Sequence, residues 1–209
     1  MKVLIQNLQK KQGLASHLIQ EYEPDVMLAQ EINLPSEEED QSPLCPYKAS
    51  NTSYLGFGTA IYSKTPITNI RTINSPYHEF GGFIRKRTTV ANSNGIQFVS
   101  FHGYNGIPFR NKTKLVSHVK AVLTLLSSGP AVFAGDFNTW SQDHLDSIVL
   151  TLKNEGFELV FSWPYKGRKL PLDHVFLRNI NLLSSTFFSC PSDHFGALVE
   201  IDAECNTFE

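Results

Sequence analysis

Apolar and polar residues follow one another along the chain in a pattern that predicts strands and helices in mixed order. Residues 2–7 form an apolar run typical of a buried strand. Apolar residues recur at helical spacing over residues 14–22, and Pro24 is expected to end that helix. Residues 26–29 predict a second strand. A strand–helix–strand unit of this kind pairs its strands in parallel, with the helix as the crossover.

The middle of the chain consists of short β-prone segments separated by Pro, Asn and Gly. These segments cover residues 58–63, 67–73, 88–91 and 96–101. Asn94-Gly95 lies between the last two of them and is a strong signal for a two-residue β-hairpin.

Helical periodicity returns in the second half of the chain. Residues 115–126 carry one apolar face, and Gly129-Pro130 is expected to close this helix. A strand then leads into the sequence GDFNTW, and a third helix is expected over residues 145–152, with Ser141 as its cap. Three further β-prone segments cover residues 158–161, 172–177 and 195–201.

The order of these elements predicts one α/β domain over residues 1–209. Strands and helices mix without strict alternation, which favours a sandwich of β-sheets covered by helices over a pure doubly wound sheet. No internal repeat, low-complexity segment or clear linker divides the sequence.

Composition predicts a soluble globular protein of the cytoplasm. Hydrophobic residues make up 41% of the 209 positions, and no apolar run is long enough to cross a bilayer as a helix. The N-terminal apolar run is too short for a signal peptide. The three cysteines, Cys45, Cys190 and Cys205, show neither metal-binding spacing nor a disulfide framework, which suits a reducing compartment. The sequence implies no partner protein.

Charge gives no global case for a nucleic-acid binder, because the formal net charge is −2. Basic residues nevertheless gather locally, at residues 85–87, 110–114 and 166–169, either as a solvated rim or as part of a phosphate site. The acidic run at residues 37–40, between two prolines, is expected to be a loop.

Chemically active side chains fall at the ends of the predicted strands. They are Asn7, Glu31, His102, Asp136, Asn138, Asp173, Asp193 and His194. Taken singly, each could be a turn former or a solvated polar group. Ligands of α/β sheets bind in the crevice at strand ends, so the co-occurrence of these groups favours one shared site.

Three of these groups suit a hard cation. Oxygen ligands from Glu31 and Asp193, with the Asn7 amide nearby, fit Mg²⁺, with Mn²⁺ as an alternative. No Cys/His cluster offers the tetrahedral ligand set of structural zinc. A divalent cation that faces a phosphate stabilises the charge that builds on its oxygens.

The other five groups suit hydrolysis of a phosphoester. Asp136 would orient or deprotonate the attacking water, and Asn138 would hold a phosphoryl oxygen or that water. His102 and His194 would donate to phosphate oxygens or protonate the leaving group. Asp173 would hold His194 in the required tautomer and stabilise its charged form.

Motifs along nearly the whole chain resemble one known superfamily. They are VLIQNL, DVMLAQEI, GTAIYSKTPI, FVSFHGYN, AGDFNTW, PLDHVFL and SDHFGALVEI. The chain resembles the endonuclease/exonuclease/phosphatase group, which contains DNase I-like nucleases, apurinic-site endonucleases, sphingomyelinases and inositol-polyphosphate phosphatases. GDFN followed by SDH in this order is the most specific part of the match, and the spelling GDFNTW looks most like small uncharacterised bacterial members.

The resemblance implies a four-layer α/β sandwich, in which two mixed sheets pack face to face with helices outside. It implies that Glu31 is the principal metal ligand, with Asn7 beside it and Asp193 completing or supporting the site. By the same resemblance, Asp136 aligns the nucleophilic water and Asn138 contacts the phosphate.

The resemblance also assigns the histidines and one further amide. His102 matches a histidine of DNase I-like members, and Asn105 matches an amide that contacts phosphate. His194 would face the phosphate, paired with Asp173. Two departures stand out: Gln9 occupies a place where some members have an acid, and no glutamate partner of His102 is identified, although Glu79 is available.

Substrate choice stays open between two kinds of enzyme, with a nuclease acting on DNA or RNA favoured. Arg87 and the other basic residues would follow a phosphate backbone, and Tyr104, Phe109 or Trp163 would stack on bases. The alternative is a phosphatase or phosphodiesterase for small phosphoesters or lipid headgroups, and a membrane-directed member would need an exposed aromatic hairpin that the sequence does not clearly show. The third alternative is a non-catalytic binding protein that retains the fold.

Overall fold

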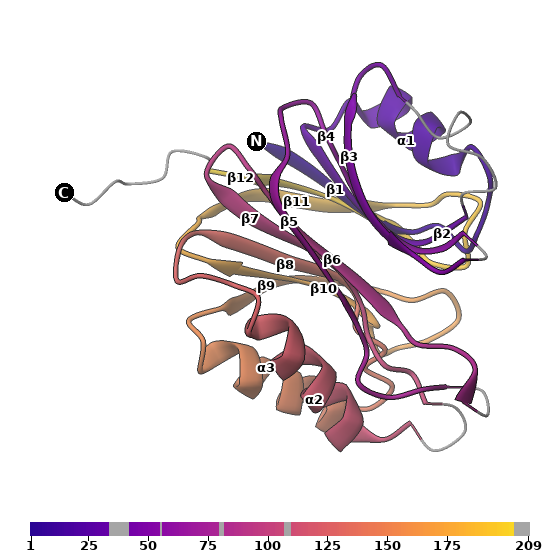
Figure 1. Ribbon diagram of the computed structural model, residues 1–209, viewed down its shortest axis with the longest axis vertical. Coiled ribbons are helices and arrows are strands. Elements are labelled where there is room, and N and C mark those ends of the chain that lie inside the picture. Colours follow the sequence, from indigo (N-terminus) through magenta and orange to yellow (C-terminus); the bar gives the residue numbers. More distant parts are fainter. Residues whose placement is uncertain (34–41, 55, 80–81, 107–109, 203–209) are drawn as a thin grey trace.

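The structure, a computed structural model, describes residues 1–33, 42–54, 56–79, 82–106 and 110–202. The acidic run 37–40 therefore lies outside the described residues, as do Phe109 and Cys205. Two mixed sheets of six strands each form the centre of the molecule (Figure 1).

The first sheet has the strand order β11-β12-β1-β2-β4-β3. Its strands are β1 (Lys2–Asn7), β2 (Val26–Asn33), β3 (Tyr47–Thr52), β4 (Phe57–Ser63), β11 (Leu182–Phe188) and β12 (Gly196–Ile201). Strands β1 and β2 are parallel and are connected by helix α1 (Leu14–Tyr22), while the other neighbours are antiparallel.

The second sheet repeats this plan with the order β5-β6-β7-β8-β10-β9. Its strands are β5 (Thr68–Asn74), β6 (Arg87–Ser93), β7 (Ile96–His102), β8 (Ala131–Asp136), β9 (Glu158–Trp163) and β10 (Asp173–Arg178). Helix α2 (Lys112–Leu123) connects the parallel pair β7 and β8, and helix α3 (Gln142–Lys153) follows β8. Parallel pairs need such crossovers, so each sheet contains one β–α–β unit.

Three hydrophobic cores hold the layers together. The inner core lies between the sheets and includes Ile5, Leu28, Phe98 and Val132. Helix α1 covers the outer face of the first sheet, and α2 and α3 cover the outer face of the second (Figure 1). The predicted four-layer sandwich is confirmed.

Local sequence signals explain most of the element boundaries. The side chain of Asn111 caps α2 by accepting a hydrogen bond from the Lys114 backbone N–H, and Ser141 caps α3 as predicted. Strands β3 and β11 were not predicted, because they are edge strands whose sequences, YKASNT and LLSSTFF, lack a buried apolar run. Within the described ranges no helix is long and apolar enough to cross a lipid bilayer, and Cys45 and Cys190 are free thiols.

The two sheets approach closely beside Gly135, the glycine of the GDFN motif. A Cβ atom at Gly135 would lie 2.2 Å from the Phe101 carbonyl oxygen and 2.8 Å from the Gln30 side-chain nitrogen. Gln30 reaches across from the first sheet and donates a hydrogen bond to Ser100 Oγ at 3.1 Å. The φ angle of 137° at Gly135 is also one that other residues rarely adopt. Only glycine therefore fits between the sheets at the end of β8.

We expect Gly135→Ala to lower the free energy of unfolding by roughly 3 kcal/mol or more, since it adds both a backbone clash and φ strain. Gly95→Ala is the matched control: Gly95 also has a positive φ, but a Cβ there meets nothing within 4 Å, so its cost should stay near 1 kcal/mol. Urea unfolding of both variants measures the difference. Equal losses would show that close sheet approach does not constrain this position.

A second buried feature, His118 of α2, has no polar partner. Its ring packs against Phe101 with centroids 4.9 Å apart, and neither ring nitrogen has a hydrogen-bond partner among the described residues. Burial, with a smaller contribution from the positive charge of Lys86, lowers the pKa of His118 to about 3. The ring is therefore neutral in the folded protein near neutral pH.

This histidine should make the fold acid-labile. Its pKa is about 6.5 in an unfolded chain, so its contribution to stability is complete above that pH and is lost as pH falls toward 3. At pH 5 the loss amounts to about 2 kcal/mol. We expect His118→Leu to remove that part of the difference in unfolding free energy between pH 7.5 and pH 5, whereas replacement of the exposed His17 should not. A pH-dependent loss unchanged in His118→Leu would contradict the argument.

Candidate active site

Most of the predicted side chains meet at one edge of the sandwich, where strands from both sheets end. Asn7 ends β1, His102 ends β7, and Asp136 ends β8. Asp173 begins β10 directly opposite Asp136 in the antiparallel pairing. All four are buried, although each carries a polar group. Buried polar groups persist where they contact one another or a ligand, so this edge is the candidate active site.

Asp136 lies at the centre of the cluster. Its Oδ2 accepts a hydrogen bond from the Asn7 amide at 3.1 Å, across the gap between the two sheets. The same oxygen is 3.5 Å from His102 Nε2 and 3.8 Å from His194 Nε2. Three predicted residues from three separate chain segments thus surround one carboxylate oxygen of Asp136.

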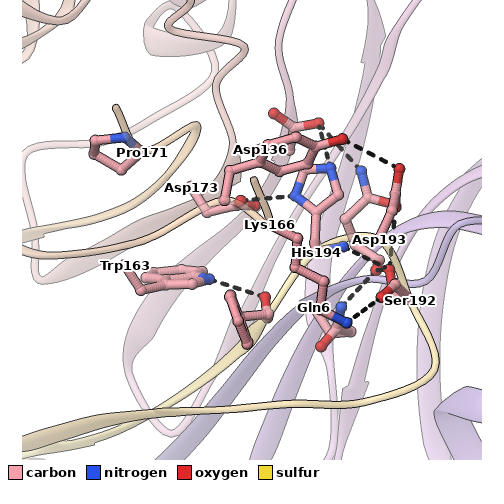
Figure 2. Close-up of polar contacts among 12 residues, drawn as sticks. Gln6, Asp136, Trp163, Lys166, Pro171, Asp173, Ser192, Asp193 and His194 are labelled. Atoms are coloured by element: carbon pink, nitrogen blue, oxygen red, sulfur yellow. Dashed lines mark hydrogen bonds and ion pairs between the residues drawn. The ribbon is translucent and has the colours of Figure 1, made fainter. Parts of the chain in front are cut away.

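His194 lies between two carboxylates, those of Asp136 and Asp173 (Figure 2). Its Nδ1 is 2.7 Å from Asp173 Oδ2, so the predicted contact is present. Burial by itself would lower the pKa of His194, but Asp173, Asp136 and Asp193 together raise it to about 10. His194 is therefore an imidazolium near neutral pH.

The other two groups of the cluster are shifted by burial. Burial raises the pKa of Asp136 to about 7, with the Asp173 carboxylate adding to the rise while His194 and Lys86 oppose it. Burial also lowers the pKa of His102 well below its ordinary value, and the nearby positive charge of Lys86 adds to the shift. The two histidines thus differ in charge: His102 is neutral and His194 is positive.

Glu31 reaches this cluster through a β-bulge. The pairing of β2 with β4 shifts register between Gln30 and Ile32, and Glu31 itself has a φ of 48°. A bulge turns a side chain away from regular alternation, and here it leaves the Glu31 carboxylate 3.6 Å from His102 Nε2 and 27% exposed. Strained backbone of this kind tends to occur at functional sites.

Asn138 holds the turn that follows Asp136. Its backbone N–H donates to Asp136 Oδ1 at 2.9 Å, and its φ is 55°. Its side-chain nitrogen donates to the Gly103 carbonyl, while its side-chain oxygen accepts from the Trp140 indole N–H at 3.2 Å. Both ends of the amide therefore have protein partners, which favours positioning of Asp136 over the predicted phosphate contact.

The Asn105 side-chain nitrogen has no hydrogen-bond partner among the described residues. Its side-chain oxygen accepts from the Trp140 indole N–H at 2.7 Å. Its backbone N–H donates to the buried Glu79 carboxylate at 2.5 Å, and the Gly106 N–H donates to the same oxygen. Glu79 thus fixes the loop that carries Asn105 and is not hydrogen-bonded to His102.

Asp193 lies beside the cluster and not within it. Its carboxylate is 3.4 Å from the Tyr165 hydroxyl, and its backbone N–H donates to the Gln9 side chain at 3.2 Å. Lys166 binds the backbone carbonyls of Cys190 and Ser192 and so holds the segment that carries His194 (Figure 2). No contact between Asp193 and Glu31 occurs among the described side chains.

Two residues predicted to bind substrate take different positions. Arg87 lines the cavity described below and donates to the side chains of Asn51 and Asn74. Tyr104 is only 6% exposed and packs in the outer core against Tyr77. Trp163 is likewise buried, with its N–H donating to the Phe195 carbonyl (Figure 2). Neither ring is placed to stack on a base.

A cavity of about 470 Å³ opens beside Glu31 and His102. Its lining includes the basic residues Lys10, Arg85, Lys86 and Arg87 and the aromatic residues Tyr54, Phe57 and Phe83. Tyr54 and Phe83 are 97% and 91% exposed. Lys86 also reaches His102 Nε2 at 2.5 Å. The sequence analysis placed Lys86 in the basic run 85–87 but did not predict that it reaches the site. Nothing in that run indicates which of its three side chains faces His102.

Comparison with known proteins identifies the family. A model described as Endonuclease/Exonuclease/phosphatase family matches residues 7–194. The chain belongs to this family.

The other comparisons show the fold of the endonuclease/exonuclease/phosphatase family. A UPF0294 protein of Vibrio vulnificus (strain YJ016) is 47% identical over 58 residues, 26% of this chain and 20% of that protein. The match thus spans about a fifth of the relative's length. A family protein from Leptotrichia buccalis C-1013-b has a TM-score of 0.70 at 18% identity, covering 97% of this chain and 99% of that one. The 3'-5' exonuclease (NExo) from Neisseria meningitidis has a TM-score of 0.67 at 16% identity, covering 97% and 100%.

Members of this family generally use divalent metals. Among the described side chains, no group of three or more His, Cys, Asp or Glu is close enough to enclose an ion. Mg²⁺ needs less, because it keeps several waters and binds through one or two carboxylates. Asn7 is paired with Gln30 in the parallel register of β1 and β2, so the partly exposed Glu31 follows directly beside it. The Glu31 carboxylate fits an open, water-rich site, while the Asn7 side-chain oxygen accepts a hydrogen bond from the Gln9 backbone N–H at 3.0 Å.

We expect Asp173→Asn to lower the pKa of His194 by roughly 1–3 units, because burial is then opposed by fewer negative charges. The measurement is an NMR titration of the His194 ring in metal-free protein. Asp143→Asn is the matched control, since Asp143 lies on α3 and pairs with Lys112 at the surface. The same His194 pKa in wild type and Asp173→Asn would contradict this electrostatic assignment.

Proposed function

We propose that the chain is a divalent-metal-dependent phosphodiester hydrolase that acts on DNA or RNA. The observation that carries this proposal is that a buried proton acceptor, Asp136, lies next to a buried proton donor, His194. Asp136 has a pKa raised to about 7 by burial, and His194, 3.8 Å away, has a pKa raised to about 10 by three carboxylates. Near neutral pH, Asp136 can therefore accept a proton while His194 keeps its own, and the two groups are suited to separate roles.

Asp136 is the proposed base. A base whose pKa lies near neutral pH is efficient, because it is both available and strong enough to accept a proton. The attacking water gives its proton to an Asp136 oxygen as its own oxygen forms the bond to phosphorus. The bond from phosphorus to the leaving oxygen breaks on the opposite side, and that oxygen takes a proton from solvent. Asn7 and the Asn138 backbone N–H keep the carboxylate oriented during this step.

His194 and Asn105 are the proposed donors to the phosphate. The imidazolium Nε2 of His194 points toward Asp136, while its Nδ1 is held by Asp173. The amide nitrogen of Asn105, which has no partner among the described residues, provides a second donor, because the side-chain oxygen is already bound to Trp140. Fixed donors aimed at developing negative charge stabilise a transition state more than flexible ones. His102 is neutral and is therefore proposed to position Glu31 and Asp136.

Glu31 and Asn7 are the residues that would hold the metal ion, and Asp193 would add negative charge beside the site. The bound ion supplies a positive charge that polarises a phosphate oxygen. The ion would also offset the repulsion between the buried carboxylates of Asp136 and Asp173.

A nucleic-acid substrate is supported by the cavity beside the site. Lys10, Arg85, Lys86 and Arg87 give one side of the reaction centre a positive lining despite the negative net charge of the chain. Exposed Tyr54 and Phe83 lie on the same cavity and could stack on bases. One of the solved structures with the same fold is named a 3'-5' exonuclease. We propose that this chain likewise acts on a nucleic acid.

The same two rings support a second candidate function. Exposed aromatic side chains next to lysine and arginine also suit an anionic lipid surface. Tyr54 and Phe83 precede β4 and β6, so two separate loops carry the exposed rings that a lipid-headgroup hydrolase would need. The two candidates differ in substrate and share the catalytic cluster.

We expect the protein with Mg²⁺ to hydrolyse at least one substrate from a panel of plasmid DNA, RNA, abasic duplex, phosphoinositide vesicles and sphingomyelin vesicles. Glu31→Gln should lower the rate by roughly 100-fold or more, since it weakens the metal site, and EDTA should abolish activity. Glu158→Gln is the matched control, because Glu158 is exposed on β9.

Hydrolysis confined to the vesicles would replace the nuclease assignment with the lipid one. A wild-type protein as inert as Glu31→Gln on the whole panel would favour the non-catalytic binding protein and defeat the proposal.

A further inference from the structure

Two arginines lie over one tryptophan next to the active site. The guanidinium carbon of Arg110 is 3.7 Å from the Trp140 ring centroid, and that of Arg168 is 4.5 Å from it. Arg110 comes from the loop before α2 and Arg168 from the loop between β9 and β10, so distant parts of the sequence meet at this ring. We call Arg110, Trp140 and Arg168 the arginine–tryptophan stack.

Neither guanidinium has a negatively charged partner in the part of the chain that the structure describes. Among the described residues, no carboxylate lies within salt-bridge distance of Arg110 or Arg168, and neither side chain donates a hydrogen bond. Stacking on an aromatic face holds a guanidinium plane while leaving its N–H edge open. Elsewhere in the chain the arginine side chains are engaged: Arg71 and Arg178 bind backbone carbonyls, and Arg87 binds two asparagines. The stack is therefore an open set of fixed donors.

The stack is joined directly to the groups proposed to hold the phosphate. The Trp140 N–H donates to the side-chain oxygens of both Asn105 and Asn138. Trp140 also meets Tyr165 edge-on with centroids 6.2 Å apart, and Tyr165 meets His194 at 4.7 Å. Only one side chain thus separates the stack from His194. The stack is also distinct from the basic cavity, which Arg110, Trp140 and Arg168 do not line.

We propose that the arginine–tryptophan stack binds a second phosphate of the substrate, on the nucleotide next to the linkage that is cleaved. Guanidinium forks bind phosphate oxygens in pairs, and a fork already held in place loses little freedom on binding. A substrate with a single phosphate would leave these donors unused, so the stack selects a strand over an isolated phosphoester. This inference rests on the proposed function, because it takes the cluster around Asp136 as the place of the first phosphate.

The binding test uses nucleotides in EDTA, so that no hydrolysis occurs. Intrinsic fluorescence reports on the stack because Trp140 is one of only two tryptophans and the other, Trp163, is buried in the inner core. Thymidine 3′,5′-bisphosphate should bind roughly 10–100-fold more tightly than thymidine 5′-monophosphate, as expected for added charged hydrogen bonds. Arg110→Gln and Arg168→Gln should each reduce that ratio to less than about threefold, whereas Arg168→Lys should retain part of it.

The matched control is Lys120→Gln, which removes one positive charge from an exposed position of α2. It should keep the wild-type ratio, which separates a fixed phosphate contact from general attraction between charges. Equal affinity for the two nucleotides, undetectable binding of the bisphosphate, or an unchanged ratio in both arginine variants would overturn the proposal. Tighter binding of inositol 1,4-bisphosphate than of the nucleotide would overturn its assignment to a nucleic acid.

A second arm separates this inference from the proposed function. With Mg²⁺, a short oligonucleotide that carries one neutral methylphosphonate beside the cleaved linkage should be hydrolysed at least about tenfold more slowly than its all-phosphate counterpart. Hydrolysis without such a difference would leave the nuclease in place and remove the second phosphate site. Bisphosphate binding without any hydrolysis would leave the phosphate site in place and remove the proposed catalysis.

Discussion

The hydrogen bond between Asn7 and Asp136 is the contact on which the candidate site depends. It joins the end of β1 in one sheet to the end of β8 in the other. The two ends can meet only because Gly135 leaves room for Gln30 and for the neighbouring backbone. Packing of the inner core and placement of the proposed catalytic carboxylate thus depend on each other, since anything that separates the sheets also separates Asn7 from Asp136.

Burial of this edge gives the polar cluster its chemistry. An exposed aspartate would be a weak base and an exposed histidine would be largely neutral at pH 7. Enclosed together, Asp136 becomes a stronger base and His194 keeps its proton, because Asp173 and the other carboxylates stabilise the charged ring. Unlike Asp136 and His194, the side chains of Glu31, Arg110 and Arg168 are partly or largely exposed, so an ion or a phosphate can reach them. The site thus combines a dry centre with accessible charges around it.

The sequence predicted the residues whose position follows from a strand end and missed those whose position follows from tertiary packing. Asp136 and His102 end apolar runs, and parallel neighbours bring such ends together. The bulge at Glu31, the hydrogen bonds of Asn138 and the burial of Tyr104 depend on neighbours that no local pattern specifies. Edge strands β3 and β11 were missed for a related reason, because an edge needs no apolar face of its own and its pairing partner supplies the order.

The origin of the site residues in both sheets also affects when activity can arise during synthesis. The Ser192 hydroxyl donates to the Asn7 carbonyl across 185 positions of sequence, and His194 follows two residues later. A nascent chain that has formed its first β–α–β unit holds Asn7 and Glu31 but lacks Asp136, Asp173 and His194. The full set of candidate site residues is therefore assembled only when β12 pairs with β1 and closes the first sheet. Under the proposed function, incomplete chains and truncated fragments would lack hydrolytic activity, so the topology would delay activity until synthesis is complete without an inhibitor.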